Sequence, residues 1–348
     1  MIPVSIITGF LGSGKTTLLG HLLRDPAMGR TAVIINEFGE IGLDHDLIET
    51  SDESFIQLST GCLCCKVRSD LVLTLGDLAA RRAAGTVPQF ERVVIETTGL
   101  ADPAPILHAL MTDRALNEAY ALDGVVTTVD AVTGIGTLEQ QRESARQIAV
   151  ADRIVLTKAD LPSAQTGAIS KRLRQLNPGA PVLSVVHGSI SPAALFDTGL
   201  YVIDGKHPDV RAWLADETIA TSQAHQHHDE QITSACIVRE EPVHAVTLAL
   251  MLSALAENCG DDLLRMKGIV QVREQPERPA VIHGVQHVYH APVWLERWPS
   301  ADRRTRIVFI GRNIRASWLH TLLDLLETET AEEIAQRQSP QNSMPRAI

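Results

Sequence analysis

The sequence has no surplus of positive charge. Its 348 residues contain 31 Lys and Arg side chains against 42 Asp and Glu side chains, which gives a formal net charge of -11. Proteins that bind nucleic-acid backbones or anionic membrane surfaces usually carry basic patches. We therefore expect no nucleic-acid partner and no membrane partner. Hydrophobic residues make up 45% and charged residues 21%, as in ordinary folded proteins, and the length suggests two domains.

The chain also lacks a long apolar segment, and we expect no signal peptide. Its longest apolar helical run, residues 245–256, is shorter than the roughly 20 residues that a membrane-spanning helix needs. No positively charged region precedes the apolar stretch near the N-terminus, as it would in a signal peptide. We therefore expect a cytoplasmic protein.

Cysteines are few and poorly suited to disulfide bonding. There are five, and three of them (Cys62, Cys64 and Cys65) lie within four positions. An odd, clustered set is unlike the disulfide framework of a secreted protein. A reducing compartment and a thiolate function fit better. We expect Cys236 and Cys259 to be packing residues.

Residues 1–204 alternate short β-rich runs with helical patterns. This alternation predicts an α/β fold, with helices covering both faces of a mostly parallel sheet. The expected strands are 4–8, 31–35, 92–95, 124–129, 153–157 and 182–185. The expected helices are 16–23, 70–83, 103–110, 139–149 and 164–176.

The pattern changes after residue 204. Residues 205–231 are polar and are interpreted as a linker with a His-rich loop. Strands then cluster between two helices, which predicts a smaller C-terminal α+β domain over 232–328. Its expected strands are 233–239, 269–273, 280–283, 288–290 and 306–310, and its expected helices are 244–257 and 316–327. We expect the polar residues 329–348 to be a disordered tail.

A phosphate-binding loop follows the first expected strand. Residues 9–16 match G-x-x-x-x-G-K-[ST] in full and open an expected helix, as this motif requires. The N–H groups of such a loop point at phosphates, and the helix N-terminus adds partial positive charge. Lys15 can reach the β- and γ-phosphates, and the Thr16 hydroxyl can bind Mg²⁺. The loop residues expected at the nucleotide are Gly9, Gly12, Ser13, Gly14, Lys15, Thr16 and Thr17.

An acidic residue ends the third expected strand. Glu96 stands where P-loop proteins place a second Mg²⁺ ligand, although Asp is more usual there. Gly99 can offer its backbone N–H to the γ-phosphate. We expect Lys15, Thr16 and Glu96 to be the catalytic residues. Without the P-loop, the same segment would be compatible with a plain buried strand.

A base-recognition segment follows the fifth expected strand. The Asp160 carboxylate can accept hydrogen bonds from guanine N1–H and N2–H₂, a donor pair that adenine does not offer, so GTP is favoured over ATP. The stem of Lys158 can lie across the base. Guanine motifs usually begin with Asn, and Thr157 departs from that pattern. The alternative is a loop whose Asp caps the next helix.

The clustered cysteines form the second chemical signal. Three thiols can bind a thiophilic ion, with Zn²⁺ favoured and Co²⁺, Ni²⁺, Fe²⁺ and Cu(I) also possible. Structural cysteines and a redox switch are the alternatives. The histidines near residue 227 can bind metal weakly or be solvated loop residues. The candidate metal ligands are Cys62, Cys64 and Cys65, with Glu37, Glu40, His225, His227 and His228 as possible additions.

Together these motifs resemble the CobW-like family of P-loop GTPases. The resemblance rests on residues 9–17, 36–40, 62–65, 96–103 and 264–268, and it covers about residues 2–328. It implies a P-loop NTPase domain followed by a C-terminal domain of the CobW type. It also implies hydrolysis of GTP to GDP with Mg²⁺, coupled to delivery of Zn²⁺ or Co²⁺ to a client metalloprotein. A homodimer is possible.

The resulting hypothesis is a metal-regulated GTPase that acts as a metallochaperone. One alternative is an activator or assembly factor for a specific metalloenzyme or for a cobalamin pathway. A non-hydrolytic metal buffer and an ATP-using small-molecule kinase are further alternatives, and Asp160 argues against the kinase. No Gln follows Gly99 at once, so Glu37, Glu40 and Asp44 are the candidates for positioning the attacking water.

Overall fold

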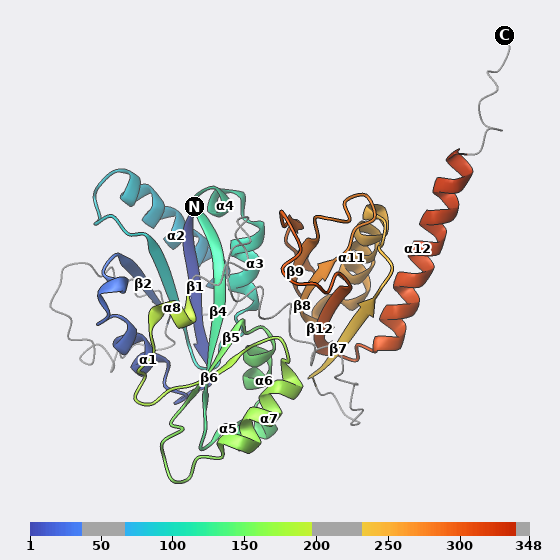
Figure 1. Ribbon diagram of the computed structural model, residues 1–348. Coiled ribbons are helices and arrows are strands. Elements are labelled where there is room, and N and C mark those ends of the chain that lie inside the picture. Colours follow the sequence, from blue (N-terminus) through green and yellow to red (C-terminus); the bar gives the residue numbers. More distant parts are fainter. Residues whose placement is uncertain (37–66, 197–231, 339–348) are drawn as a thin grey trace.

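A six-stranded parallel sheet organises the first part of the chain (Figure 1). The computed structural model describes residues 1–36, 67–196 and 232–338. The strands lie in the order β2-β3-β1-β4-β5-β6, and every neighbouring pair is parallel. They are β1 (Ile2–Gly9), β2 (Thr31–Asn36), β3 (Arg92–Thr97), β4 (Tyr120–Asp130), β5 (Arg153–Thr157) and β6 (Val182–Ser184).

Helices cover both faces of this sheet. The reason is visible along β3, whose side chains alternate between two cores: Val93 and Ile95 pack with α2 and α3, whereas Val94 packs with α1. The helices are α1 (Lys15–Leu22), η1 (Pro26–Met28), α2 (Val67–Ala83), α3 (Ala104–Thr112), α4 (Arg114–Ala119), α5 (Gly134–Gln140), α6 (Arg142–Ala149), α7 (Thr166–Leu176) and α8 (Pro192–Leu195).

A second, antiparallel sheet forms the C-terminal domain, with strand order β10-β9-β8-β12-β7 and β11 paired to β9. Its elements are β7 (Ile232–Arg239), α11 (Ala245–Cys259), η3 (Gly260–Asp262), β8 (Leu263–Val270), β9 (Ala280–Val285), β10 (Val288–Tyr289), β11 (Val293–Trp294), β12 (Thr305–Arg312) and α12 (Ala316–Gln338).

This second sheet is buried between two layers. One face packs on α11 and α12, where Phe309 lies with Leu255 and Leu319. The other face packs on the first domain, and Figure 1 shows it beside α3. There Val308 contacts the cluster that contains Ala149 of α6. The two domains therefore share a hydrophobic seam.

The fold class expected from the sequence is confirmed, and three details differ. Helix α12 continues to Gln338, so residues 329–338 are helical rather than a disordered tail. The expected helix 139–149 is two helices, because Gln141 adopts an extended backbone conformation between them. Residues 264–268 lie inside strand β8, ahead of the expected strand at 269–273. Among the described helices, none is both long and apolar enough to cross a membrane.

Candidate nucleotide site

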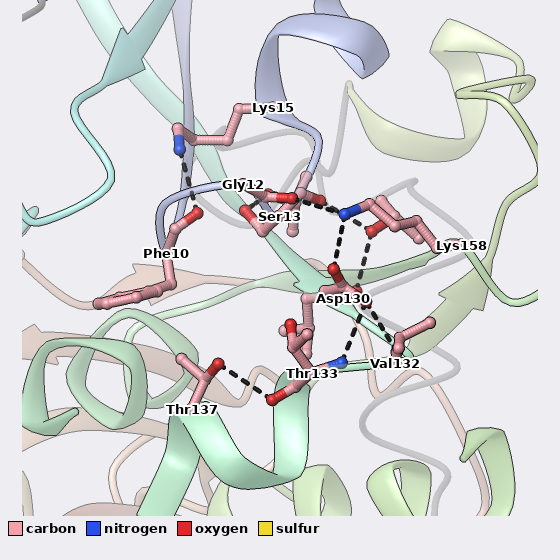
Figure 2. Close-up of polar contacts among 12 residues, drawn as sticks. Phe10, Gly12, Ser13, Lys15, Asp130, Val132, Thr133, Thr137 and Lys158 are labelled. Carbon is pink, nitrogen blue, oxygen red and sulfur yellow. Dashed lines mark hydrogen bonds and ion pairs between the residues drawn. The ribbon is translucent and has the colours of Figure 1, made fainter. Parts of the chain in front are cut away.

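The P-loop connects the end of β1 to the start of α1 (Figure 2). Gly14 is the N-cap of α1 and has a left-handed backbone, with φ of 90°. Gly9 lies against β4 so closely that an added Cβ would be 2.3 Å from Thr128 Oγ1. Both positions need glycine, one for its backbone conformation and the other for space.

Lys15 lies across this loop. Its side chain is largely buried, and Nζ donates to the carbonyl oxygens of Gly9 at 3.0 Å and Phe10 at 3.3 Å. Ser13 Oγ is 2.6 Å from Thr128 Oγ1, which ties the loop to β4. The ammonium group is therefore held beside the loop backbone, within the part of the loop that the motif assigns to phosphates.

Thr16 and Glu96 meet although 80 residues separate them. Thr16 Oγ1 donates to Glu96 Oε1 at 2.9 Å, and Glu96 is only 4% exposed. The pairing follows from topology, because β1 and β3 are parallel neighbours and end at the same edge of the sheet. A hydroxyl and a carboxylate beside a phosphate-binding loop are hard oxygen donors, which fit Mg²⁺.

The loop after β3 lies on the P-loop. An added Cβ on Gly99 would be 2.6 Å from the backbone nitrogen of Leu11, so only glycine allows this approach. Gln147 of α6 donates through Nε2 to the carbonyl oxygens of Gly99 at 3.1 Å and Ala101 at 3.0 Å. Sequence reasoning missed Gln147, because it precedes no motif and reaches the site only through the packing of α6.

The structure gives Thr157 a clear structural role. Its Oγ1 lies 2.8 Å from the carbonyl oxygen of Ser13 and 3.2 Å from that of Val129, and it can donate its proton to either. The hydroxyl thus links the end of β5 to the P-loop and to β4. Thr157, which stands where guanine motifs usually have Asn, therefore keeps a polar side chain that anchors the P-loop.

Lys158 reaches the same loop from the other side, as Figure 2 shows. Its backbone is left-handed, with φ of 55°, and its Nζ donates to the Gly12 carbonyl at 3.0 Å and to Asp130 Oδ2 at 2.7 Å. Asp130 Oδ1 accepts from the backbone N–H groups of Val132 and Thr133. Burial alone would raise the pKa of Asp130, but these hydrogen bonds and Lys158 lower it. Asp130 is a second residue that sequence reasoning missed.

Asp160 lies at the edge of the site. Its carboxylate is partly exposed, and His187 Nε2 is 4.0 Å away. Gly188, which follows His187 in the sequence, lies close to α1, since an added Cβ would be 3.0 Å from the Thr17 carbonyl oxygen. The two loops that follow β5 and β6 therefore lie next to each other beside the P-loop helix.

The candidate metal ligands lie outside the described residues: Cys62, Cys64, Cys65, Glu37, Glu40, His225, His227 and His228. Within the described ranges, no group of three or more His, Cys, Asp or Glu could hold a metal ion. Burial raises the pKa of Cys236 to about 11 and also raises that of Cys259, so both thiols stay protonated at neutral pH.

Two protein-family models match the chain. A family model described as the CobW/HypB/UreG nucleotide-binding domain matches residues 3–184. A model described as the cobalamin synthesis protein cobW C-terminal domain matches residues 232–326.

Relatives match along most of the chain. The zinc chaperone YjiA of Escherichia coli is 35% identical over 89% of this chain and 94% of its own length. The crystal structure of Zn(II)-bound YjiA GTPase from E. coli has a TM-score of 0.69 at 28% identity, and the match covers 93% of this chain and 98% of that one. The zinc-regulated GTPase metalloprotein activator 1 of Saccharomyces cerevisiae is 27% identical over 92% of this chain and 82% of its own length.

Proposed function

Because the chain belongs to the CobW/HypB/UreG family and is a GTPase, we propose that it is a metallochaperone that couples GTP hydrolysis to metal delivery. The cargo in this proposal is Zn²⁺, with Co²⁺ as the alternative, bound by Cys62, Cys64 and Cys65. The names of the E. coli and yeast relatives support zinc as the metal and a metalloprotein as the client.

One observation carries the coupling of metal to nucleotide. Strand β2 ends at Asn36, and in the parallel pairing with β3, Ile35 is opposite Glu96 and Asn36 is opposite Thr97. The segment that contains the cysteines therefore leaves the sheet beside Glu96, the residue in contact with Thr16. A structural change at the phosphates can thus pass from Glu96 to the start of the cysteine-containing segment, across the distance between two neighbouring strands.

The proposed roles of the site residues follow from their positions. Lys15 would move its ammonium from the loop carbonyls to the β- and γ-phosphates, which neutralises charge as the γ-phosphate leaves GDP. Thr16 and Glu96 would hold Mg²⁺, which supplies further charge neutralisation when bound. The N–H of Gly99 would face the γ-phosphate.

The base-recognition segment, residues 157–160, would select guanine. Asp160 would accept the two guanine donors, and Thr157 would keep the P-loop in place beside β5. Lys158 is held by Asp130 and Gly12, which supports the proposal that its stem would lie across the base. Attack of water on the γ-phosphorus breaks its bond to the β–γ bridging oxygen and yields GDP and phosphate.

The proposal is tested by phosphate release from GTP with metal-free protein and with added Zn²⁺, Co²⁺, Ni²⁺ or Fe²⁺. We expect GTP turnover that one of these ions changes, and loss of turnover in Lys15→Ala. The metal content of the protein as purified identifies the cargo. Turnover that Lys15→Ala leaves intact would contradict the phosphate site, and turnover that no metal affects would contradict the coupling.

An activator of one specific metalloenzyme is the second candidate, and the name of the yeast relative favours it. The two candidates differ in the client. A general chaperone would pass Zn²⁺ to several apo-proteins, whereas an activator would load one of them in a GTP-dependent manner. A non-hydrolytic metal buffer does not fit a GTPase.

A further inference from the structure

Gln147 connects helix α6 to the loop that follows β3. Its side chain is fully buried, with 0% exposure. Its Nε2 donates two hydrogen bonds to one short loop, to the carbonyl oxygens of Gly99 and Ala101. Its own backbone carbonyl accepts from Thr127 Oγ1 of β4 at 2.8 Å. The loop is therefore tied to α6, and α6 is tied to the central sheet.

The other atom of the amide shows why this position holds Gln. Gln147 Oε1 is buried and has no hydrogen-bond partner among the described residues. An unpaired buried acceptor is unfavourable, and Leu would fill the same space without it. The two donated hydrogen bonds are thus what the side chain contributes here, rather than its packing.

The loop needs such an anchor because of its glycine. Gly99 must be glycine to lie against Leu11, and glycine restrains its own backbone less than any other residue. The Gly99 carbonyl belongs to the peptide between Gly99 and Leu100, and the Ala101 carbonyl belongs to the peptide between Ala101 and Asp102, so Gln147 fixes these two peptide planes. The Ala101 N–H donates to the Thr98 carbonyl at 3.1 Å, and that carbonyl shares its peptide plane with the Gly99 N–H, so the anchored loop keeps this N–H in one orientation beside the P-loop.

We propose that Gln147 is a positioning residue for GTP hydrolysis, which holds Gly99 so that its N–H faces the γ-phosphate. This inference rests on the proposed function, because it takes Gly99 as the γ-phosphate contact. Gln147 itself does not contact the nucleotide. Its loss should therefore affect steps that involve the γ-phosphate and should leave GDP binding intact.

The test uses Gln147→Leu and Gln147→Glu in the full-length protein. Leu removes both donated hydrogen bonds, and Glu keeps the shape but replaces the donating Nε2 with an oxygen that faces both carbonyl groups. Ile148→Val is the matched control, since Ile148 is a buried residue of the same helix that belongs to the separate apolar cluster of Ile154 and Leu173. Measurements are kcat and KM for GTP, and the Kd values of GDP and of a non-hydrolysable GTP analogue.

For both Gln147 variants we expect kcat to fall by about tenfold to a hundredfold. The GTP analogue should bind more weakly, while the Kd of GDP stays within about twofold of wild type. Ile148→Val should change none of these values. If the wild-type protein is active and the Gln147 variants keep its kcat, the inference is overturned. Equally weakened binding of GDP and of the GTP analogue would also overturn it. A wild-type protein without GTPase activity would instead overturn the proposed function, and this inference with it.

Discussion

Replacing Asp152 by Asn removes a buried negative charge from the seam between the two domains. Asp152 lies just before β5, and its Oδ1 accepts from Arg265 Nη2 of β8 at 2.7 Å and also pairs with Lys267. The Asp152 side chain is 0% exposed, and the two cations are 2% and 7% exposed. Its Oδ2 accepts from the backbone N–H of Val125 at 2.8 Å.

The expected loss of stability follows from this buried environment. Burial alone would raise the pKa of Asp152, but Arg265 and Lys267 lower it to about 2. A shift from 3.8 to about 2 corresponds to roughly 2 kcal/mol of stability. Breaking a buried ion pair by removing one partner costs about 3–5 kcal/mol, because the remaining charges stay desolvated. We therefore expect Asp152→Asn to lower the free energy of unfolding by about 3 kcal/mol and Tm by about 4 °C.

Thermal unfolding followed by calorimetry measures the effect, and Glu91→Gln is the control. Glu91 pairs with Arg30 on the surface, where both side chains are more than half exposed, so its loss should cost less than about 1 kcal/mol. The Asp152 contribution is present above pH ~4 and is lost as pH falls toward 2, so the variant and wild type should converge in acid. A variant as stable as Glu91→Gln at pH 7 would refute this reasoning.

Three further changes test other parts of the structure. Glu327→Gln should cost about 1–2 kcal/mol in urea unfolding, because Glu327 accepts from the backbone N–H and ring of His244 and from Thr247. Burial alone would raise the pKa of Glu327, but these bonds lower it below its ordinary value, so the cost should vanish as pH falls through this lowered pKa. A cost that persists after the carboxyl is protonated would contradict the assignment. Thr157→Val should weaken GDP and GTP binding by about tenfold, while Thr157→Ser stays near wild type in nucleotide titrations, since only the hydroxyl anchors Ser13. Asp160→Ala should weaken GTP binding by at least about tenfold and leave ATP binding unchanged, and equal losses for both nucleotides would exclude Asp160 from base selection.

The sequence predicted the parts of the fold that local patterns encode. The apolar runs of β1 and β3 are buried strands, and the P-loop glycines are where a left-handed backbone and a close approach require them. The spacing of parallel strands also explains why the expected partners Thr16 and Glu96 meet. These features depend on neighbouring residues or on the general topology of parallel sheets.

The features that were missed depend on tertiary contacts. Gln147 shows no local pattern, because Gly99 is 48 residues away in sequence, and the contact of Asp130 with Lys158 spans 28 residues. Strand β8 lacks the alternation of a half-exposed strand, since helices cover one of its faces and the first domain covers the other. The end of α12 was expected to be disordered from its polarity, but its Ala, Glu and Gln residues are good helix formers that extend a helix already packed at Leu319.

The most direct test of the account measures Zn²⁺ affinity in two nucleotide states, with GDP and with a non-hydrolysable GTP analogue. Linkage requires that a nucleotide which changes metal affinity is itself bound differently in the presence of the metal. We predict that Zn²⁺ binds at least about fivefold more tightly with the GTP analogue, and that Cys64→Ala with Cys65→Ala abolishes this binding. Equal Zn²⁺ affinity in both nucleotide states, or unchanged affinity in the cysteine variant, would contradict it.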